Sequence, residues 1–320
     1  VAMIYTTQRM AEIQELADSV IVLRDGKHVF EAGIEDAGEE TIVRAMVGRE
    51  LDALFPDQAM TTGPVRLEVR GLQVDRNGPT VDLEVRQGEI LGIGGLVGAG
   101  RTEILESLFG IRRSYGGTVL LDGEPIPRNN VSASIRSGCA LVPEDRKGAG
   151  LVLCRSVLDN ASLPHLGAFT IAGWMRPLTR RAAVDDAMTS VNLKSRGLGQ
   201  IVETLSGGNQ QRVVVGRWLT QDERVLLLDE PTRGVDVGAR GEIYTLIRDL
   251  AASGLAVVFV SSDMPELIGL SHRVLVARAG AIVGELDRAA LDCEDAQERI
   301  FRLASGQAFD VFGKQTACAS

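Results

Sequence analysis

The sequence predicts an α/β fold, because strands that are apolar throughout stand beside amphipathic helices. Residues 225–228 form an apolar run that ends in Asp229 and Glu230, so this buried strand delivers an acidic pair to its carboxyl end. The run LAVVFV at 255–260 is a second core strand. A third strand, at 89–94, leads through a glycine-rich turn into an amphipathic helix, and this order of elements is typical of α/β proteins.

The turn after the third strand, GLVGAGRT, has the composition of a phosphate-binding loop. Its glycines let backbone amides turn onto a phosphate, and Thr102 offers a hydroxyl for Mg²⁺. Arg101 stands where the pattern GxxxxGK[ST] has lysine; it keeps the charge but has a different geometry. We therefore expect that the turn still binds phosphate but that hydrolysis of a bound nucleoside triphosphate is slower. For this segment taken alone, a turn with a purely structural role is the alternative. The expected loop residues are Gly95, Gly98, Ala99, Gly100, Arg101, Thr102 and Glu103.

A second motif, LSGGNQQR at 205–212, begins a helical pattern that runs from Asn209 to Leu219. A serine and two glycines at a helix start leave free backbone amides where the helix dipole favours an anion. About twenty residues later comes the acidic pair, at the sheet edge where nucleoside-triphosphate folds hold Mg²⁺ and the attacking water.

In this order the motifs GLVGAGRTE, VPEDRK, LSGGNQQR, LDEPTRGVDVGAR and SSDMPEL resemble the ABC transporter ATPase family. The resemblance covers essentially the whole chain and is closest to the C-terminal half of duplicated ATPases of ribose-, galactose- and xylose-type sugar importers. It implies a P-loop NTPase fold with a mixed sheet core, an antiparallel β subdomain and a helical insertion. The insertion is expected at about 151–200, with helices at 160–166 and 180–193, and faces the membrane subunits in the family.

The resemblance also implies the catalytic residues and the two bound ATP molecules. Glu230 is the expected general base, with Asp229 beside it. The family places a histidine against the γ-phosphate where this chain has Ser262, and Gln8 occupies the matching position near the N-terminus. His28, His165 and His272 match no such motif and are expected at the surface or in packing. Which of the two ATP sites hydrolyses stays open.

The resemblance further implies which residues bind Mg²⁺ and which contact the ATP of the partner domain. Glu144 stands where the family has glutamine, and with Thr102 and Asp229 it makes the expected Mg²⁺ ligand set. For Glu144 and the following Asp-Arg-Lys the alternative is a solvated charged turn. No aromatic residue stands where the family stacks adenine, so Val74 or Arg76 would serve. The expected cap of the partner's ATP consists of Ser206, Gly207, Gly208 and Gln210, with Asp236 in the D-loop.

Composition narrows the functional classes. A net charge of −9 argues against nucleic acid as the main ligand, because a phosphate backbone calls for a basic face. No apolar run approaches the ~18 residues that span a bilayer, so a membrane role would fall to a partner. The four cysteines show no metal-like spacing, and we expect Cys139 and Cys154 to be core residues.

The chain contains an internal repeat. The segment that starts at Val1 aligns without gaps with the one that starts at Leu255, at a constant offset of 254 (255 − 1). We expect 1–50 to be the end of a first ATPase domain, 51–64 a linker, 65–306 a second domain and 307–320 a tail. A second domain opening near 65 implies about 190 residues (255 − 65) missing from the first copy. A short protein with an N-terminal extension is the alternative.

The functional prediction is an ATPase that energises a bacterial importer of monosaccharides, with ATP and Mg²⁺ as cofactors. Its expected partners are two transmembrane permease subunits, an external sugar-binding protein acting through them, and a first ATPase domain or a second copy. Its expected place is the cytoplasmic face of the cell membrane. The alternative is a non-hydrolysing nucleotide-binding module that regulates the same transporter.

Overall fold

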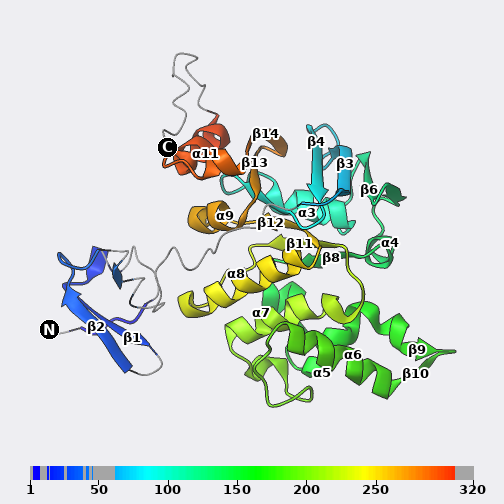
Figure 1. Ribbon diagram of the computed structural model, residues 1–320, viewed down its shortest axis with the longest axis horizontal. Helices are drawn as coiled ribbons and strands as arrows, with labels where there is room; N and C mark the ends of the chain where they lie inside the picture. Colours follow the sequence, from blue (N-terminus) through cyan, green and yellow to red (C-terminus); the bar gives the residue numbers. More distant parts are fainter. Residues whose placement is uncertain are drawn as a thin grey trace.

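The computed structural model describes residues 3–7, 13, 15–24, 27–38, 41–42, 45 and 62–306. These residues form two hydrophobic cores, a small one near the N-terminus and a large one that belongs to 62–306. The N-terminal hairpin stands to one side of the larger unit (Figure 1). The expected switch residue Gln8, most of the expected linker and the expected tail lie outside the described residues.

The larger core is built on a six-stranded mixed sheet in the order β14-β13-β5-β12-β11-β8. Every neighbouring pair is parallel except β13 and β14. The first four strands along the chain, β5, β8, β11 and β12, are buried at every position, as expected for continuous apolar runs in a sheet covered on both faces. The strands are β5 (Ile90–Gly94), β8 (Cys139–Val142), β11 (Val225–Asp229), β12 (Ala256–Val260), β13 (Arg273–Arg278) and β14 (Ala281–Leu286).

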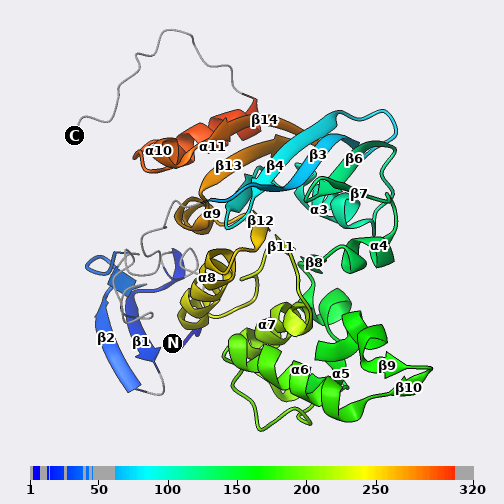
Figure 2. The same cartoon turned by 45° about the vertical axis from the view of Figure 1, so that its right-hand side comes forward.

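A four-stranded antiparallel sheet in the order β4-β3-β6-β7 lies beside this core, where β4 contacts β12 and β14 (Figure 2). β4 alternates strictly between buried and exposed side chains, because one of its faces packs on the core. The expected α/β class, with a mixed sheet and an antiparallel β subdomain, is confirmed. The strands are β3 (Val65–Gln73), β4 (Thr80–Arg86), β6 (Gly116–Leu121) and β7 (Glu124–Ile126).

Helices connect and cover the strands. α3 packs on β8 and β11, α8 on β12, α9 on β5, and α11 on β13 and β14. Side-chain caps fix where α8 and α9 begin, because Asp236 and Asp263 accept hydrogen bonds from backbone amides of the first turn. The helices are α3 (Arg101–Phe109), α4 (Val131–Arg136), α7 (Gly207–Gly216), α8 (Val237–Ala252), α9 (Met264–Leu270), α10 (Arg288–Leu291) and α11 (Ala296–Ser305), with short turns η2 (Arg146–Gly150), η4 (Val202–Thr204) and η5 (Trp218–Thr220).

A helical insertion lies at the opposite end of the unit from the antiparallel sheet (Figure 1). Both of its expected helices begin three residues earlier than predicted. Ser156 caps the first helix by accepting from the Asp159 amide, and a proline at position 177 opens the second. Its elements are α5 (Val157–Ser162), η3 (Leu163–Phe169), β9 (Thr170–Ile171), β10 (Trp174–Met175) and α6 (Pro177–Ser190).

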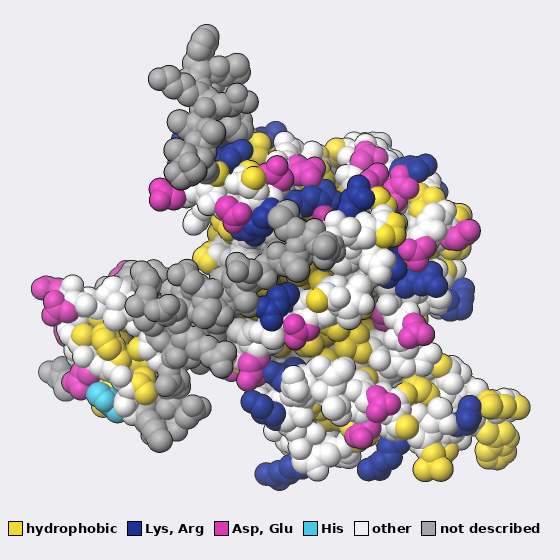
Figure 3. Space-filling view, in the orientation of Figure 1, with side chains coloured by type: hydrophobic (Ala, Val, Ile, Leu, Met, Phe, Trp, Pro, Cys, Tyr) yellow, Lys and Arg dark blue, Asp and Glu magenta, His cyan; other side chains and the backbone are white. Residues whose placement is uncertain are grey.

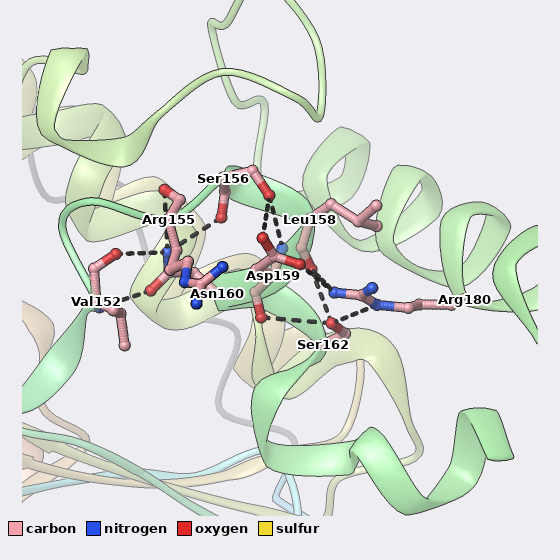
Figure 4. Close-up of polar contacts among 8 residues, drawn as sticks. All are labelled: Val152, Arg155, Ser156, Leu158, Asp159, Asn160, Ser162 and Arg180. Atoms are coloured by element: carbon pink, nitrogen blue, oxygen red, sulfur yellow. Dashed lines mark hydrogen bonds and ion pairs between the residues drawn. The ribbon is translucent and has the colours of Figure 1, made fainter. Parts of the chain in front are cut away.

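Polar contacts hold the insertion together (Figure 4). Arg180 of α6 reaches α5, where it donates to the Asp159 carboxylate at 2.7 Å and to the Ser162 hydroxyl at 2.8 Å. Because Arg180 donates to this carboxylate, the pKa of Asp159 lies below its usual value. Asn160 exchanges two hydrogen bonds with the backbone of Val152, at 2.8 and 3.0 Å, which fixes the chain that enters α5.

The N-terminal hairpin, β1 (Ser19–Arg24) and β2 (Lys27–Gly33), has the same pairing as β13 and β14. Val20 pairs with Ala32 and Val274 with Leu286, so both members of the pair are displaced by 254 (274 − 20 and 286 − 32). The register shift after Val22 recurs after Val276, at the same offset. The repeat in the sequence is therefore a repeat in backbone structure as well.

The structure also shows the burial of the cysteines and histidines and the lengths of the helices. Cys139 is buried, as predicted, whereas Cys154 is exposed, so its assignment to the core was wrong. His165 is buried between Thr220 and Glu223, and exposed His28 contacts Glu31, as expected for packing and surface residues. Within the described ranges, no helix has the length and apolar character that crossing a membrane requires.

Candidate functional site

A cleft of about 650 Å³ opens where β5, β11 and β12 end at the carboxyl edge of the main sheet. This is the edge at which open α/β sheets bind ligands. Most of the expected phosphate loop lines it, together with three of the other predicted residues. The lining comprises Val97, Gly98, Ala99, Gly100, Arg101, Thr102, Glu103, Glu144, Glu230, Thr232, Arg233, Gly234, Arg240, Ser262, Asp263 and Glu266.

The glycine turn can exist only with glycine at two of its positions. Gly95 has φ +152°, and a β-carbon there would lie 2.5 Å from the Ala277 carbonyl oxygen. Gly100 has φ +92° just before α3, where a β-carbon would lie 3.0 Å from the Cα of Gly280. The turn is therefore pressed against the hairpin β13–β14, and the residues at the start of α3 line the cleft. Gly95 supports the loop from behind and does not line the cleft.

Thr102 lines the cleft and contacts the buried Asp229 behind it. Asp229 is buried at the end of β11, and burial raises the pKa of its carboxyl to about 6, although a hydrogen bond from Thr102 and the charge of Arg101 oppose the rise. Its Oδ1 has no hydrogen-bond partner. A buried carboxylate oxygen without a partner beside a hydroxyl is a donor set that suits Mg²⁺.

Arg101 lines the cleft, but its guanidinium is held by protein groups. Its guanidinium donates to the Ser261 carbonyl oxygen at 2.6 Å and lies 3.7 Å from the Glu230 carboxylate. Glu230 also accepts from the Ser262 hydroxyl at 3.1 Å, and its backbone φ of +45° is rare for a residue with a side chain. The predicted catalytic Glu230 and Ser262 are thus brought together, and Arg101 ties them to the end of β12.

Glu144 lines the same cleft and is only half-buried. It forms an ion pair with Arg233, which follows the acidic pair in sequence. Thr102 and Asp229 of the expected Mg²⁺ set are in contact, while Glu144 belongs to a separate ion pair on the cleft wall. Among the predicted adenine contacts, Val74 is buried in the core and cannot stack on a base, whereas Arg76 is exposed.

The expected cap residues lie outside this cleft, at the start of α7. Ser206 caps the helix, since its hydroxyl accepts from the Asn209 backbone amide at 3.5 Å. The same hydroxyl also accepts from the Asn209 side-chain amide at 2.9 Å. Gly207 and Gly208 follow at the free amino end of the helix. Gln210 is buried and donates to the Val202 carbonyl oxygen, so its side chain points inward rather than to a cap surface. Asp236 caps α8 and is exposed.

A family model settles what this arrangement belongs to. The model described as ABC transporter matches residues 79–233, which span the glycine turn, the start of α7 and the acidic pair. Over residues 79–233 the chain carries an ABC transporter domain.

Relatives of this ABC transporter domain span most of the chain. A putative ribose/galactose/methyl galactoside import ATP-binding protein of Pseudomonas fluorescens is 43% identical over 95% of this chain and 58% of its own length. The ribose import ATP-binding protein RbsA 1 of Streptomyces avermitilis is 46% identical over 89% of this chain and 55% of its own. The chain thus spans little more than half the length of these relatives.

Solved structures share the fold. A dimeric post-hydrolysis state of the ATP-binding cassette MJ0796, bound to ADP and Pi, has 22% identity and a TM-score of 0.59, covering 69% of this chain and 98% of that one. The cbiO1 protein of Clostridium perfringens has 21% identity and a TM-score of 0.62, covering 75% and 95%. At these identities the likeness concerns the fold alone.

The ABC transporter domain also holds a site residue that the sequence analysis missed. Glu266 is buried at the cleft, where it accepts from the Ser261 hydroxyl at 2.7 Å and from the Thr232 hydroxyl at 2.9 Å. Burial raises the pKa of its carboxyl to about 7. It links the segment after β11 to the end of β12, beside Ser262. The sequence signal is the spacing Asp263-x-x-Glu266, a capping-box pattern at the start of a helix.

Proposed function

We propose that the chain is the ATP-binding and ATP-hydrolysing subunit of a bacterial importer for monosaccharides. The names of the relatives at 42–46% identity support this proposal, since they describe ribose or galactose import ATP-binding proteins. The subunit would act at the cytoplasmic face of the cell membrane, bound to permease subunits that receive sugar from an external binding protein. Closing on ATP and reopening after hydrolysis would switch the permease between its two states.

The contact between Thr102 and Asp229, with the partnerless oxygen of Asp229 and Glu230 at the next position, carries the proposal. Thr102 and Asp229 would hold Mg²⁺, which when bound offsets the negative charge of the phosphates. The amides of the glycine turn would bind the phosphate oxygens. Glu230 would orient the attacking water and accept its proton, once its carboxylate is free of Arg101.

We further propose that the ATPase works as two domains. Residues 1–50 would end a first domain, 51–64 would link it to the second at 65–306, and 307–320 would be a tail. The shared pairing register of β1–β2 and β13–β14 supports this division. Ser206, Gly207 and Gly208 would then face the ATP of the first domain or of a second copy, with Asp236 beside them.

The helical insertion is the proposed contact with the permease. Its tip, the hairpin β9–β10, exposes an apolar surface visible as yellow side chains at the far end of the insertion (Figure 3). Trp174 is 82% exposed, and Ile171 lies beside it on the hairpin and is also exposed. Exposed aromatic and aliphatic side chains grouped in this way are typical of a protein-binding surface.

ATP turnover in permease-containing membranes tests the function. Glu230→Gln should lower the turnover number ~100-fold or more, because the general base is lost, while ATP binding persists. Glu203→Gln, which changes an exposed glutamate on η4, is the matched control and should leave turnover unchanged. Failure of the wild-type protein to bind ATP would refute the whole proposal.

The non-hydrolysing module is a second candidate, and one observation favours it: Arg101 and Ser262 occupy the Glu230 carboxylate. In that case the domain would bind ATP and close without consuming it. Equal turnover of wild type and Glu230→Gln, both with ATP bound, would establish this second function in place of the first.

A further inference from the structure

Four arginines are buried in the described part of the chain, and one of them stands apart. Arg101, Arg212 and Arg217 each donate to backbone carbonyl oxygens, and Arg101 and Arg212 also contact a glutamate. Arg217 in addition lies 5.2 Å from the ring of Trp218. Arg146 is only 8% exposed, yet its Nε and Nη1 have no hydrogen-bond partner.

The acidic neighbours of Arg146 are committed elsewhere. Asp145 accepts from the backbone amides of Lys147 and Gly148, at 3.1 and 2.9 Å, and Glu144 pairs with Arg233. Burial lowers the pKa of Arg146, with no carboxylate opposing the shift. A buried cation without hydrogen bonds or a counter-charge is costly, so the protein keeps an unfavourable group here.

Arg146 lies at the amino end of α7. A β-carbon on Gly207 would lie 3.3 Å from its Nη2 and 3.2 Å from the Gly234 carbonyl oxygen. The guanidinium is therefore placed between the first turn of α7 and the segment after the acidic pair. The amino end of a ten-residue helix already carries positive partial charge, so a cation beside it is repelled. An anion bound between Arg146 and the start of α7 would offset both the unpaired charge and its repulsion from the helix dipole.

We propose that Arg146 is a phosphate-binding residue of the α7 face, and that it binds the terminal phosphate of a nucleotide presented by another ATPase domain. The inference rests on the proposed two-domain function. Ser206 and the amides of Gly207 and Gly208 would share the same phosphate. A planar guanidinium suits this role, because two of its N–H groups can meet two phosphate oxygens at once.

Stability without nucleotide provides the first test. Arg146→Met replaces the unpartnered cation with an apolar chain of similar length and should raise the unfolding midpoint by about 2–4 °C. Lys147→Met, which removes the same charge from the exposed neighbouring residue, is the control and should shift it less. Inorganic phosphate should stabilise wild type more than Arg146→Met, because the variant keeps only the phosphate loop. A lower midpoint for Arg146→Met, with phosphate stabilising both proteins alike, would make Arg146 structural and overturn the proposal.

Nucleotide provides the second test, in the polypeptide that carries both ATPase domains. Arg146→Met should weaken ATP-driven closure at least ~10-fold, the loss of one charge-assisted contact, and Arg146→Lys should restore part of it. ATP affinity at the chain's own phosphate loop, measured without the other domain, should not change. Closure unchanged in Arg146→Met overturns the proposal. A wild type that binds no ATP refutes the proposed function instead, whereas a response to free phosphate without any effect on closure assigns the site to an adventitious ion only.

Discussion

The phosphate-loop cleft and the α7 face each contain a buried arginine, but only the cleft satisfies its own. Arg101 is bound by the Ser261 carbonyl and lies beside Glu230, which the Ser262 hydroxyl also contacts. Arg146 at the α7 face has two nitrogens without partners. The arginine of the cleft thus has its partners within the protein, whereas two nitrogens of the arginine at the α7 face have none. Under the proposed function, ATP would displace contacts at one surface and supply them at the other.

The largest expected effect concerns the carboxyl of Glu266 at the cleft wall. Its folded pKa of about 7 lies above the ordinary 4.5, so the folded state holds the proton more tightly than the unfolded state does. The stability that this provides is complete below pH 4.5 and is lost as the pH rises through 7, by about 3 kcal/mol. Glu266→Gln should flatten this decline, as urea unfolding between pH 4.5 and 8 would show. If the unfolding free energy of Glu266→Gln fell with pH as steeply as that of wild type, the raised pKa of Glu266 would not be the cause of the decline.

Several groups that face Glu266 also influence the pKa of its carboxyl. Asp263 and Tyr244 lie near it as titratable groups, Arg240 as a cation, and Ser261 and Thr232 as hydroxyl donors. Asp263→Asn is the comparison variant, because it changes the nearby half-buried carboxyl that pairs with Arg240. It should leave most of the decline in place.

Asp229 is expected to give the next largest effect, on binding rather than on stability. Asp229→Asn should weaken Mg²⁺-dependent ATP affinity on the order of 100-fold, because a charged ligand is lost. In wild type the affinity should rise as the pH increases through about 6, where the carboxyl ionises. Titration with ATP at several pH values, with and without Mg²⁺, measures both. Asp222→Asn is the exposed control. If ATP affinity changed neither with Mg²⁺ nor with Asp229→Asn, Asp229 would not be a ligand of the cation.

The sequence could predict those parts of the site that depend on local pattern. Apolar runs located the strands, and the glycine spacing located the turn before α3, because both signals come from consecutive residues. The starts of α5 and α6 were misplaced by three residues, since the cap at Ser156 and the proline at 177 were not used. Both errors could have been avoided, because the capping residues are visible in the local sequence.

The remaining errors have a different origin. Arg146 occurs in a charged turn whose neighbours Asp145 and Lys147 are exposed, and only the packing of α7 against that turn buries it. Cys154 and Glu266 are likewise exposed or buried according to tertiary neighbours. Local pattern indicates which residues are polar, but the burial of a charge depends on segments distant in sequence.

Arg101→Lys should sharpen the comparison with a smaller effect. Lysine is a point charge without the planar fork, so it cannot hold the Ser261 carbonyl and Glu230 in the present geometry. Freed from one charge-assisted contact, the phosphate loop should bind ATP up to ~10-fold more tightly, equivalent to about 1.4 kcal/mol. Equilibrium ATP titration measures this, with Arg112→Lys at an exposed ion pair as control. Weaker binding would show that the guanidinium is itself the better phosphate ligand.

The smallest expected effect concerns the serine at each surface. Ser206→Ala removes the α7 cap and should cost about 1 kcal/mol of unfolding free energy, because an orphan amide loses its acceptor. Ser262→Ala removes only a hydroxyl that donates to Glu230 and should cost less than this, since that carboxylate keeps Arg101 nearby. Urea unfolding without nucleotide ranks the two. A larger loss at Ser262 would show that the cleft, rather than the α7 face, depends on its serine when no phosphate is bound.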